Sequence, residues 1–318
     1  MSGKTRRALG LGMVAGLLAA AVLAGCGLGA GSAPSAITLI VTHDFGARPV
    51  HTWNAPRVRG EETVMSLLMR NANVTTRYGG GFVESLDGSS GGDAGGQPSD
   101  WFYYVNGVEA PQGAAATKVH PGDHIWWDLH DWSQTDNVPA VVGSYPEPFL
   151  NGIGGKRLPV RIECADVSGE PCQTVSARLR ALGVPAALAG LGPGNEPETL
   201  SVLVGTWGAL RGDPAAHQIE MGPRSSGVYA RFAANGATLA LLNEQGAVAR
   251  TLAGGAGLVA ATRYAESAPT WVITGTDSAG VQTAAQSLDT AALADRFAVV
   301  LEPGGAALPA PAPGTAGG

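Results

Sequence analysis

The pattern of hydrophobic and polar positions predicts a first folded unit between Ile37 and about Trp132. Residues 37–42 and 51–58 are expected to form a strand hairpin. Residues 61–70 are expected to be a helix, capped by Thr63 or a neighbouring acid, because apolar residues recur there at helical spacing. Further strands are expected at residues 74–78, 82–86, 101–110 and 124–130. This content predicts an α+β protein with a β-grasp-like N-terminal domain (residues 37–134).

The strand at 124–130 carries the residues with the most interesting chemistry. Alternation along a strand assigns His124, Trp126, Asp128 and His130 to one face, and Ile125, Trp127 and Leu129 to the other. The second set is predicted to be core. The first set is predicted to form a ligand surface. The predicted ligand-binding residues are Trp126, Asp128 and His130, with the indole as a stacking plate, together with Tyr104 of the preceding strand. Two alternatives remain open: a solvated face, or a face packed against another domain.

A metal at this strand is the less favoured interpretation. Residues two apart on a strand are separated by about 6.8 Å, so Asp128 and His130 are close enough to share one ion, whereas His124 is not. We therefore predict no metal site.

Several residues of this unit resemble a known family. The stretch from Trp101 through Asn106-Gly107, Gly113 and Gly122-Asp123 to Ile125 and Trp127 resembles the transcobalamin-like C-terminal domain, and Thr63-Val64 also fits its pattern. That bacterial domain of unknown function is related to the smaller domain of the animal cobalamin carriers, which closes over cobalamin bound to a large α-helical barrel. The resemblance implies a corrinoid-related role. Because this sequence lacks repeated helix pairs, any barrel would belong to a partner protein.

The second half of the chain differs from the first in composition and in its pattern of expected elements. Residues 135–157 are rich in Pro and Gly and are predicted to be a linker. Residues 158–303 alternate strands and helices, which predicts an α/β domain with a mixed sheet, of no recognised family. Its expected strands are 158–164, 200–205, 228–233, 239–243, 271–275 and 297–301, and its expected helices are 172–182 and 278–288. The Gly/Pro/Ala-rich residues 304–318 are predicted to be disordered.

The first 36 residues indicate export and anchoring. Lys4, Arg6 and Arg7 precede an apolar run at residues 9–23, which is shorter than the roughly 20 residues of a membrane span and typical of a secretory signal. It ends in Leu23-Ala24-Gly25-Cys26, which resembles the lipobox of bacterial lipoproteins, where the Cys is diacylated. This predicts a signal peptide (1–25), a tether (26–36), and an extracytoplasmic protein held to the cell membrane by diacylglycerol on Cys26. An ordinary signal peptide with a chance Cys is the alternative.

Charge and cysteine content narrow the function classes. The chain has 20 Lys+Arg against 26 Asp+Glu, a net charge of −6, which disfavours nucleic acid as a partner. In an oxidising compartment, Cys164 and Cys172 are expected to form a disulfide, the alternative being two buried thiols. Asp277 is expected to cap a helix rather than leave its N-terminus open to an anion. No nucleophile motif is present, so we expect no enzymatic activity.

Two functions of different class follow. The first is a surface-anchored, non-catalytic ligand-binding protein without a cofactor of its own, which captures a ligand such as the corrinoid cobalamin. It would act together with an α-barrel partner or an uptake transporter. The second is a structural or protein-interaction module of the cell envelope with no small-molecule ligand.

Overall fold

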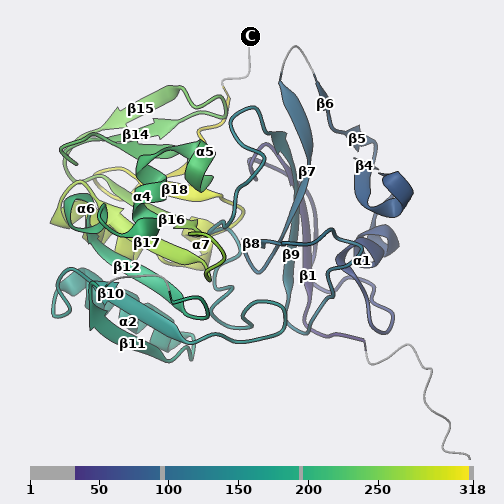
Figure 1. Ribbon diagram of the computed structural model, residues 1–318, viewed down its shortest axis with the longest axis horizontal. Helices are drawn as coiled ribbons and strands as arrows, with labels where there is room; N and C mark the ends of the chain where they lie inside the picture. The colour runs from purple at the N-terminus through teal and green to yellow at the C-terminus, as the bar shows by residue number, and fades with distance from the viewer. Residues whose placement is uncertain (1–32, 94–96, 193–195, 315–318) are drawn as a thin grey trace, which may run out of the picture.

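The computed structural model describes residues 33–93, 97–192 and 196–314. The predicted signal peptide, Cys26 and most of the predicted tether lie outside them. The protein is a mixed α+β molecule, in which an N-terminal sheet stands beside a larger C-terminal domain (Figure 1). Among the described residues, no helix has the length and apolar character needed to cross a bilayer.

The N-terminal sheet has the strand order of a β-grasp fold, whereas the sequence predicted only its content of strands and one helix. Its strands run β2-β1-β9-β7-β6, with β1 and β9 parallel in the centre and the other pairs antiparallel. The strands are β1 (Thr38–His43), β2 (Arg48–Trp53), β6 (Gly92–Asp93), β7 (Pro98–Val105), β8 (Val108–Glu109) and β9 (His124–Asp131). The two-residue strand β8 pairs with the end of β7.

One face of this sheet is covered by helix α1 (Val64–Asn71). The side chain of Thr63 accepts a hydrogen bond from the Ser66 backbone N–H (3.2 Å), and the Ser66 hydroxyl accepts one from the Thr63 N–H (2.9 Å), which confirms Thr63 as the N-cap. The buried helix residues Val64, Met65, Leu67 and Leu68 pack with the strand residues Leu39, Val41, Ile125 and Trp127. Ile125 and Trp127 are therefore core residues, as predicted.

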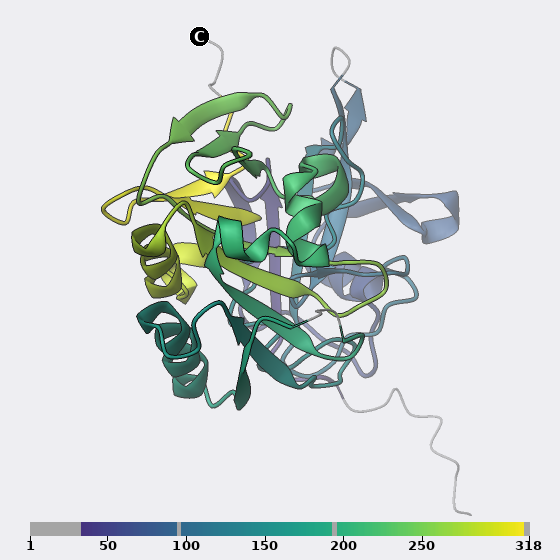
Figure 2. The same cartoon turned by 60° about the vertical axis from the view of Figure 1, so that its left-hand side comes forward.

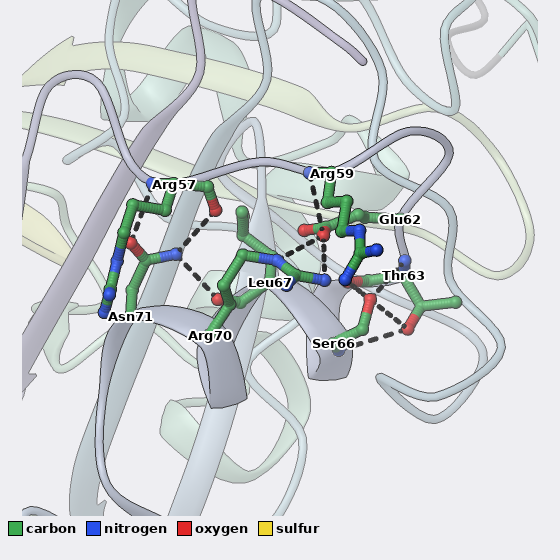
Figure 3. Close-up of polar contacts among 8 residues, drawn as sticks. All are labelled: Arg57, Arg59, Glu62, Thr63, Ser66, Leu67, Arg70 and Asn71. Atoms are coloured by element: carbon green, nitrogen blue, oxygen red, sulfur yellow. Dashed lines mark hydrogen bonds and ion pairs between the residues drawn. The ribbon is translucent and has the colours of Figure 1, made fainter. Parts of the chain in front are cut away.

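Hydrogen bonds connect the loop between β2 and α1 to residues at both ends of the helix (Figure 3). At one end, the buried carboxylate of Glu62 accepts hydrogen bonds from the Arg59 backbone N–H (3.0 Å) and the Arg70 guanidinium (2.6 Å). At the other, the Asn71 side chain bonds the backbone N–H and C=O of Arg57 (2.8 and 3.0 Å). A small antiparallel sheet follows the helix: β3 (Val74–Arg77), β4 (Phe82–Leu86) and β5 (Ser89–Ser90), with a 3-10 turn η1 (Tyr78–Gly80) between the first two.

The second domain is built on a mixed seven-stranded sheet in the order β11-β10-β12-β17-β16-β18-β19. The first four strands are parallel to one another, and the pairings from β17 to β19 are antiparallel, which confirms the predicted mixed sheet. The strands are β10 (Val160–Cys164), β11 (Ala186–Gly190), β12 (Leu200–Thr206), β16 (Gly257–Thr262), β17 (Thr270–Gly275), β18 (Ala298–Leu301) and β19 (Ala307–Ala310).

Helices cover one face of this larger sheet. They are α2 (Glu170–Ala181), α6 (Ser278–Gln286) and α7 (Thr290–Leu293), with α2 and α6 side by side (Figure 2). The Asp277 carboxylate accepts a hydrogen bond from the Gly280 N–H (2.9 Å), so the predicted capping role is confirmed. The predicted disulfide is also present: Cys164 at the end of β10 joins Cys172 in α2, and both are buried.

The opposite face packs against two different structures. One is an insertion of short helices and a three-stranded sheet, and the other is the N-terminal domain. The insertion comprises α3 (Trp207–Leu210), α4 (Pro214–Glu220), α5 (Pro223–Ser226), β13 (Ala230–Phe232), β14 (Leu239–Leu242) and β15 (Val248–Leu252). The pairing of β13 with β14 confirms the predicted hairpin.

Two predicted irregular segments are more ordered than expected. Residues 135–157 contain no named helix or strand, yet much of the segment is buried between the domains, where the Asn106 side chain donates to Gly152 O and the Asn151 side chain donates to Gly122 O. The segment is a packed layer rather than a free spacer. The prediction of disorder from residue 304 is wrong for 307–310, because β19 completes the sheet beside β18.

Candidate functional site

The structure contradicts the prediction of an exposed ligand surface on β9. Tyr104, Trp126 and Asp128 are 0% exposed and His130 is 2% exposed. Alternation does place the three β9 side chains on one face, but that face belongs to the core shared with the second domain. Of the alternatives left open by the sequence, the domain-packed face is the one observed.

Asp128 is the centre of a buried hydrogen-bond network at this domain interface. Its carboxylate accepts hydrogen bonds from the backbone N–H groups of Phe45 (3.0 Å) and Gly46 (2.9 Å). It also accepts one from the Thr42 hydroxyl and lies 2.8 Å from Nδ1 of His130. Four partners saturate the acceptor sites of one carboxylate, so Asp128 has no capacity left for a ligand.

Aromatic side chains surround this network. The His130 ring stacks on Phe102 (centroids 4.4 Å apart) and lies 4.4 Å from Phe45. Phe45 in turn contacts Tyr229 and Phe297 of the second domain edge-to-face at 5.1 and 5.0 Å. The residues predicted to bind a ligand therefore join the two domains.

A cleft of about 610 Å³ opens beside this interface. One wall is formed by the end of β7, β8 and the loop up to His120, and a second by residues 153–158. The third comes from the second domain, where residues 197–198 meet the β16–β17 loop; the Ala268 backbone N–H donates to Pro197 O (2.9 Å). β8 lies between the two domains in Figure 1. The volume and setting are those of a small-molecule site, because such pockets measure roughly 300–1,000 Å³ and favour domain interfaces.

The cleft is lined by apolar residues and by about as many polar and charged ones. Its apolar lining includes Val105, Val108, Ala110, Ile153, Leu158, Pro197, Ala268 and Pro269. Two cations of the rim are engaged in ion pairs, Lys156 with Glu198 (2.8 Å) and Lys118 with Glu61 (3.6 Å). The remaining cleft charges that bear on binding are Glu109 on β8 and Arg263 on the β16–β17 loop.

Glu109 is electrostatically unusual. Burial, followed by the neighbouring Asp136 carboxylate, raises the pKa of Glu109 to about 7, while the Val138 backbone N–H and the Arg263 charge act in the opposite direction. A carboxyl group that titrates near neutrality in a cleft marks a candidate binding residue.

This shift predicts a pH-dependent stability. The folded pKa of Glu109 lies above its ordinary value of 4.5, so its contribution is fully present below about pH 4.5 and is lost as the pH rises through about 7. Allowing for the partial exposure of the group, we expect the decrease in the free energy of unfolding between pH 5 and pH 8 to be about 1–2 kcal/mol smaller in Glu109→Gln than in the unmodified protein. Urea denaturation at both pH values measures it. Glu266→Gln, whose side chain is 98% exposed, should behave like the unmodified protein. An unchanged pH slope in Glu109→Gln would contradict the shift.

Sequence reasoning did not find this cleft. Glu109 is a single acid beside an Asn-Gly turn, and Arg263 lies more than 150 positions further along the chain. No spacing rule connects them, because their proximity depends on how the two domains pack.

Residues 61–131 match a family model described as "Domain of unknown function (DUF4430)". DUF4430 is a transcobalamin-like family, so the match agrees with the resemblance seen around Trp101 and Trp127. The DUF4430 segment runs from just before α1 to the last residue of β9, and it includes Glu109 and the first wall of the cleft.

Two further comparisons concern whole proteins. No curated protein matches the chain. A 1.30 Å crystal structure of a Ruminococcus gnavus protein with a proposed metal-binding role is similar over 30% of this chain and 97% of its own, at 17% identity and a TM-score of 0.24. Within residues 33–93, 97–192 and 196–314 of the present chain, no three His, Cys, Asp or Glu side chains are grouped so that they could hold a metal ion.

Proposed function

We propose that this chain is a non-catalytic binding protein whose ligand is a small organic molecule held between the two domains. The observation that carries the proposal is the cleft of about 610 Å³, whose walls combine apolar and charged side chains from both domains. Apolar walls supply affinity by removing ligand surface from water, and a few fixed polar groups supply orientation.

The test uses N-phenyl-1-naphthylamine, a neutral dye that fluoresces in apolar surroundings. We expect saturable fluorescence enhancement with the purified protein and at least a tenfold weaker Kd for Ala116→Trp, because this exposed alanine lines the cleft and the indole would fill it. Ala115→Trp is the matched control, since Ala115 is equally exposed but does not line the cleft. Equal binding by both variants would place the dye elsewhere and overturn the proposal.

We further propose that the protein acts outside the cytoplasm, anchored to the membrane through a diacylated Cys26. The supporting observation is the signal-like N-terminus ending in Leu23-Ala24-Gly25-Cys26. In that setting a tethered cleft would retain ligands at the cell surface for a partner such as an uptake transporter.

A corrinoid is one candidate ligand, supported by the transcobalamin-like DUF4430 segment. Because Trp126 and His130 are buried, a corrinoid would have to contact the cleft or the outer surface of the β-grasp domain, with an α-barrel partner completing the site. In a second arm of the dye experiment, cobinamide and cobalamin are titrated by calorimetry. Micromolar or tighter binding would support this ligand class. If neither cobinamide nor cobalamin gives heat, corrinoids are excluded as the ligand, and the proposed cleft is then tested by the dye experiment alone.

An envelope interaction module is the second candidate function. It is favoured by the exposed aromatic pair on the turn between β3 and β4, where Tyr78 is 84% and Phe82 64% exposed and their rings are in edge-to-face contact. Exposed aromatic residues are enriched at protein interfaces.

A further inference from the structure

Two opposite charges in the cleft come from different domains and lack strong partners. Glu109 is contributed by β8 of the N-terminal domain and Arg263 by the β16–β17 loop of the second domain. Within the described part of the chain, no cation forms an ion pair with Glu109; its carboxyl group accepts a hydrogen bond from the Val138 N–H and lies near a second acid, Asp136. The carboxyl group is therefore desolvated, and the Arg263 charge acts on it without forming an ion pair.

Arg263 is held in place by backbone groups rather than by a carboxylate. Its Nε–H donates to Ser267 O (2.6 Å), which fixes the direction of the guanidinium group. Its ion-pair partner, Glu266, is 3.8 Å away and has a side chain that is 98% exposed, so this ion pair neutralises little charge. The side chain of Arg263 is itself 23% exposed and retains N–H groups for a ligand.

The other charged groups of the cleft are less available. Lys156 donates to Glu198 at 2.8 Å, and Lys118 lies 3.6 Å from Glu61. His120 lies 3.6 Å from the buried carboxylate of Asp123. Among the residues that the structure describes, the cleft charges without a close ion-pair partner are thus one carboxyl group and one guanidinium group, both lining the same cleft.

We infer that the cleft binds a zwitterion with an apolar body, such as a short apolar peptide, with its ammonium group at Glu109 and its carboxylate at Arg263. The inference rests on the proposed binding function and names its ligand class. A simple amine would leave Arg263 uncompensated, and a simple acid would leave Glu109 uncompensated. A zwitterion supplies charge-assisted hydrogen bonds to both, while its apolar side chains cover the walls.

Three peptides that differ only at their ends test this assignment. Trileucine has both end charges, N-acetyl-trileucine lacks the ammonium group, and trileucine amide lacks the carboxylate. By calorimetry at pH 7, we expect the unmodified protein to bind trileucine at least tenfold more tightly than either blocked peptide. Proton release on binding, measured in buffers of different ionisation enthalpy, is expected for trileucine and its amide only, because an ammonium group beside Glu109 favours the ionised carboxyl group.

Substitutions at Glu109 and Arg263 test which residue binds which end of the peptide. Glu109→Gln keeps an oxygen for the Val138 N–H, and it should abolish the preference for trileucine over the N-acetyl peptide while keeping the preference over the amide. Arg263→Gln should abolish the preference for trileucine over the amide while keeping the preference over the N-acetyl peptide. Arg263→Lys should restore part of the preference over the amide. Glu84→Gln is the control and should leave both preferences unchanged, because the Glu84 side chain is 41% exposed on β4 and does not line the cleft.

The outcomes separate this inference from the proposed function. Equal affinity of the unmodified protein for the three peptides, or preferences that survive both Gln substitutions, would overturn the zwitterion. If the protein binds the naphthylamine dye but not trileucine, the zwitterion is also overturned, whereas the proposed binding function stands. Failure of both dye and peptide to bind would overturn both.

Discussion

Replacing Trp126 with alanine is expected to lower the free energy of unfolding by about 3–5 kcal/mol. The indole is fully buried, its Nε1–H donates to the Thr42 hydroxyl (2.7 Å), and its ring contacts Tyr104 and Phe297 at centroid distances of 5.9 and 5.2 Å. A Cβ on Gly143 would lie 2.7 Å from the indole, so the surrounding backbone is already closely packed around this ring. Such a site collapses poorly when the side chain is removed, and a cavity remains.

Urea denaturation followed by tryptophan fluorescence or circular dichroism measures this loss. Trp132→Ala is the control, because Trp132 lies just beyond the same strand but is 40% exposed, and we expect it to change stability by no more than about 0.5 kcal/mol. Equal midpoints for the two variants would mean that the β9 face is not buried in solution.

Replacing Asp128 with alanine is expected to cost about 3–5 kcal/mol, because it removes the shared acceptor of a buried network. The backbone N–H groups of Phe45 and Gly46 and the Thr42 hydroxyl would lose their acceptor, and His130 would lose its charged partner. Each unsatisfied buried donor costs roughly 1–3 kcal/mol, partly recovered by relaxation and entry of water.

Asp131→Ala provides the comparison for Asp128→Ala. Asp131 ends the same strand, but it is only partly buried and accepts hydrogen bonds from the Ser133 N–H (2.6 Å) and the Gln245 side chain (3.3 Å), so we expect a loss of about 1 kcal/mol. Both variants are measured by urea denaturation. A loss at Asp128 no larger than at Asp131 would contradict the network. The effects of Trp126→Ala and Asp128→Ala should add incompletely, because Thr42 bonds both side chains.

The geometry of the cleft depends on the interface between the two domains. Trp126 contacts Phe297 of the second domain, and Asp128 positions Phe45, which contacts Phe297 as well. This packing brings Glu109 of one domain to the same cleft as Arg263 of the other. Variants that loosen the interface are therefore expected to weaken ligand binding without contacting the ligand. This distinguishes them from Glu109→Gln, which changes selectivity between peptides.

Much of the local structure could be predicted from the sequence because its causes are local. The Thr63 side chain caps α1 by accepting a hydrogen bond from the backbone N–H of Ser66, three residues further along, and the Asp277 side chain caps α6 through the backbone N–H of Gly280. The disulfide of Cys164 and Cys172 followed from composition and export rather than from contacts. The tail was mispredicted because β19, although short and rich in Ala and Pro, gains its order from pairing with β18.

The sequence by itself determined which side of β9 each residue occupies, since strand alternation depends only on backbone geometry. The residues that pack against each side of β9 were decided by the tertiary structure. The partners of Trp126 and His130 include Phe297, more than 160 positions away, and no periodicity encodes such a contact. The cleft has the same origin, because Glu109 and Arg263 share it only when two independently patterned domains bury their apolar faces against each other.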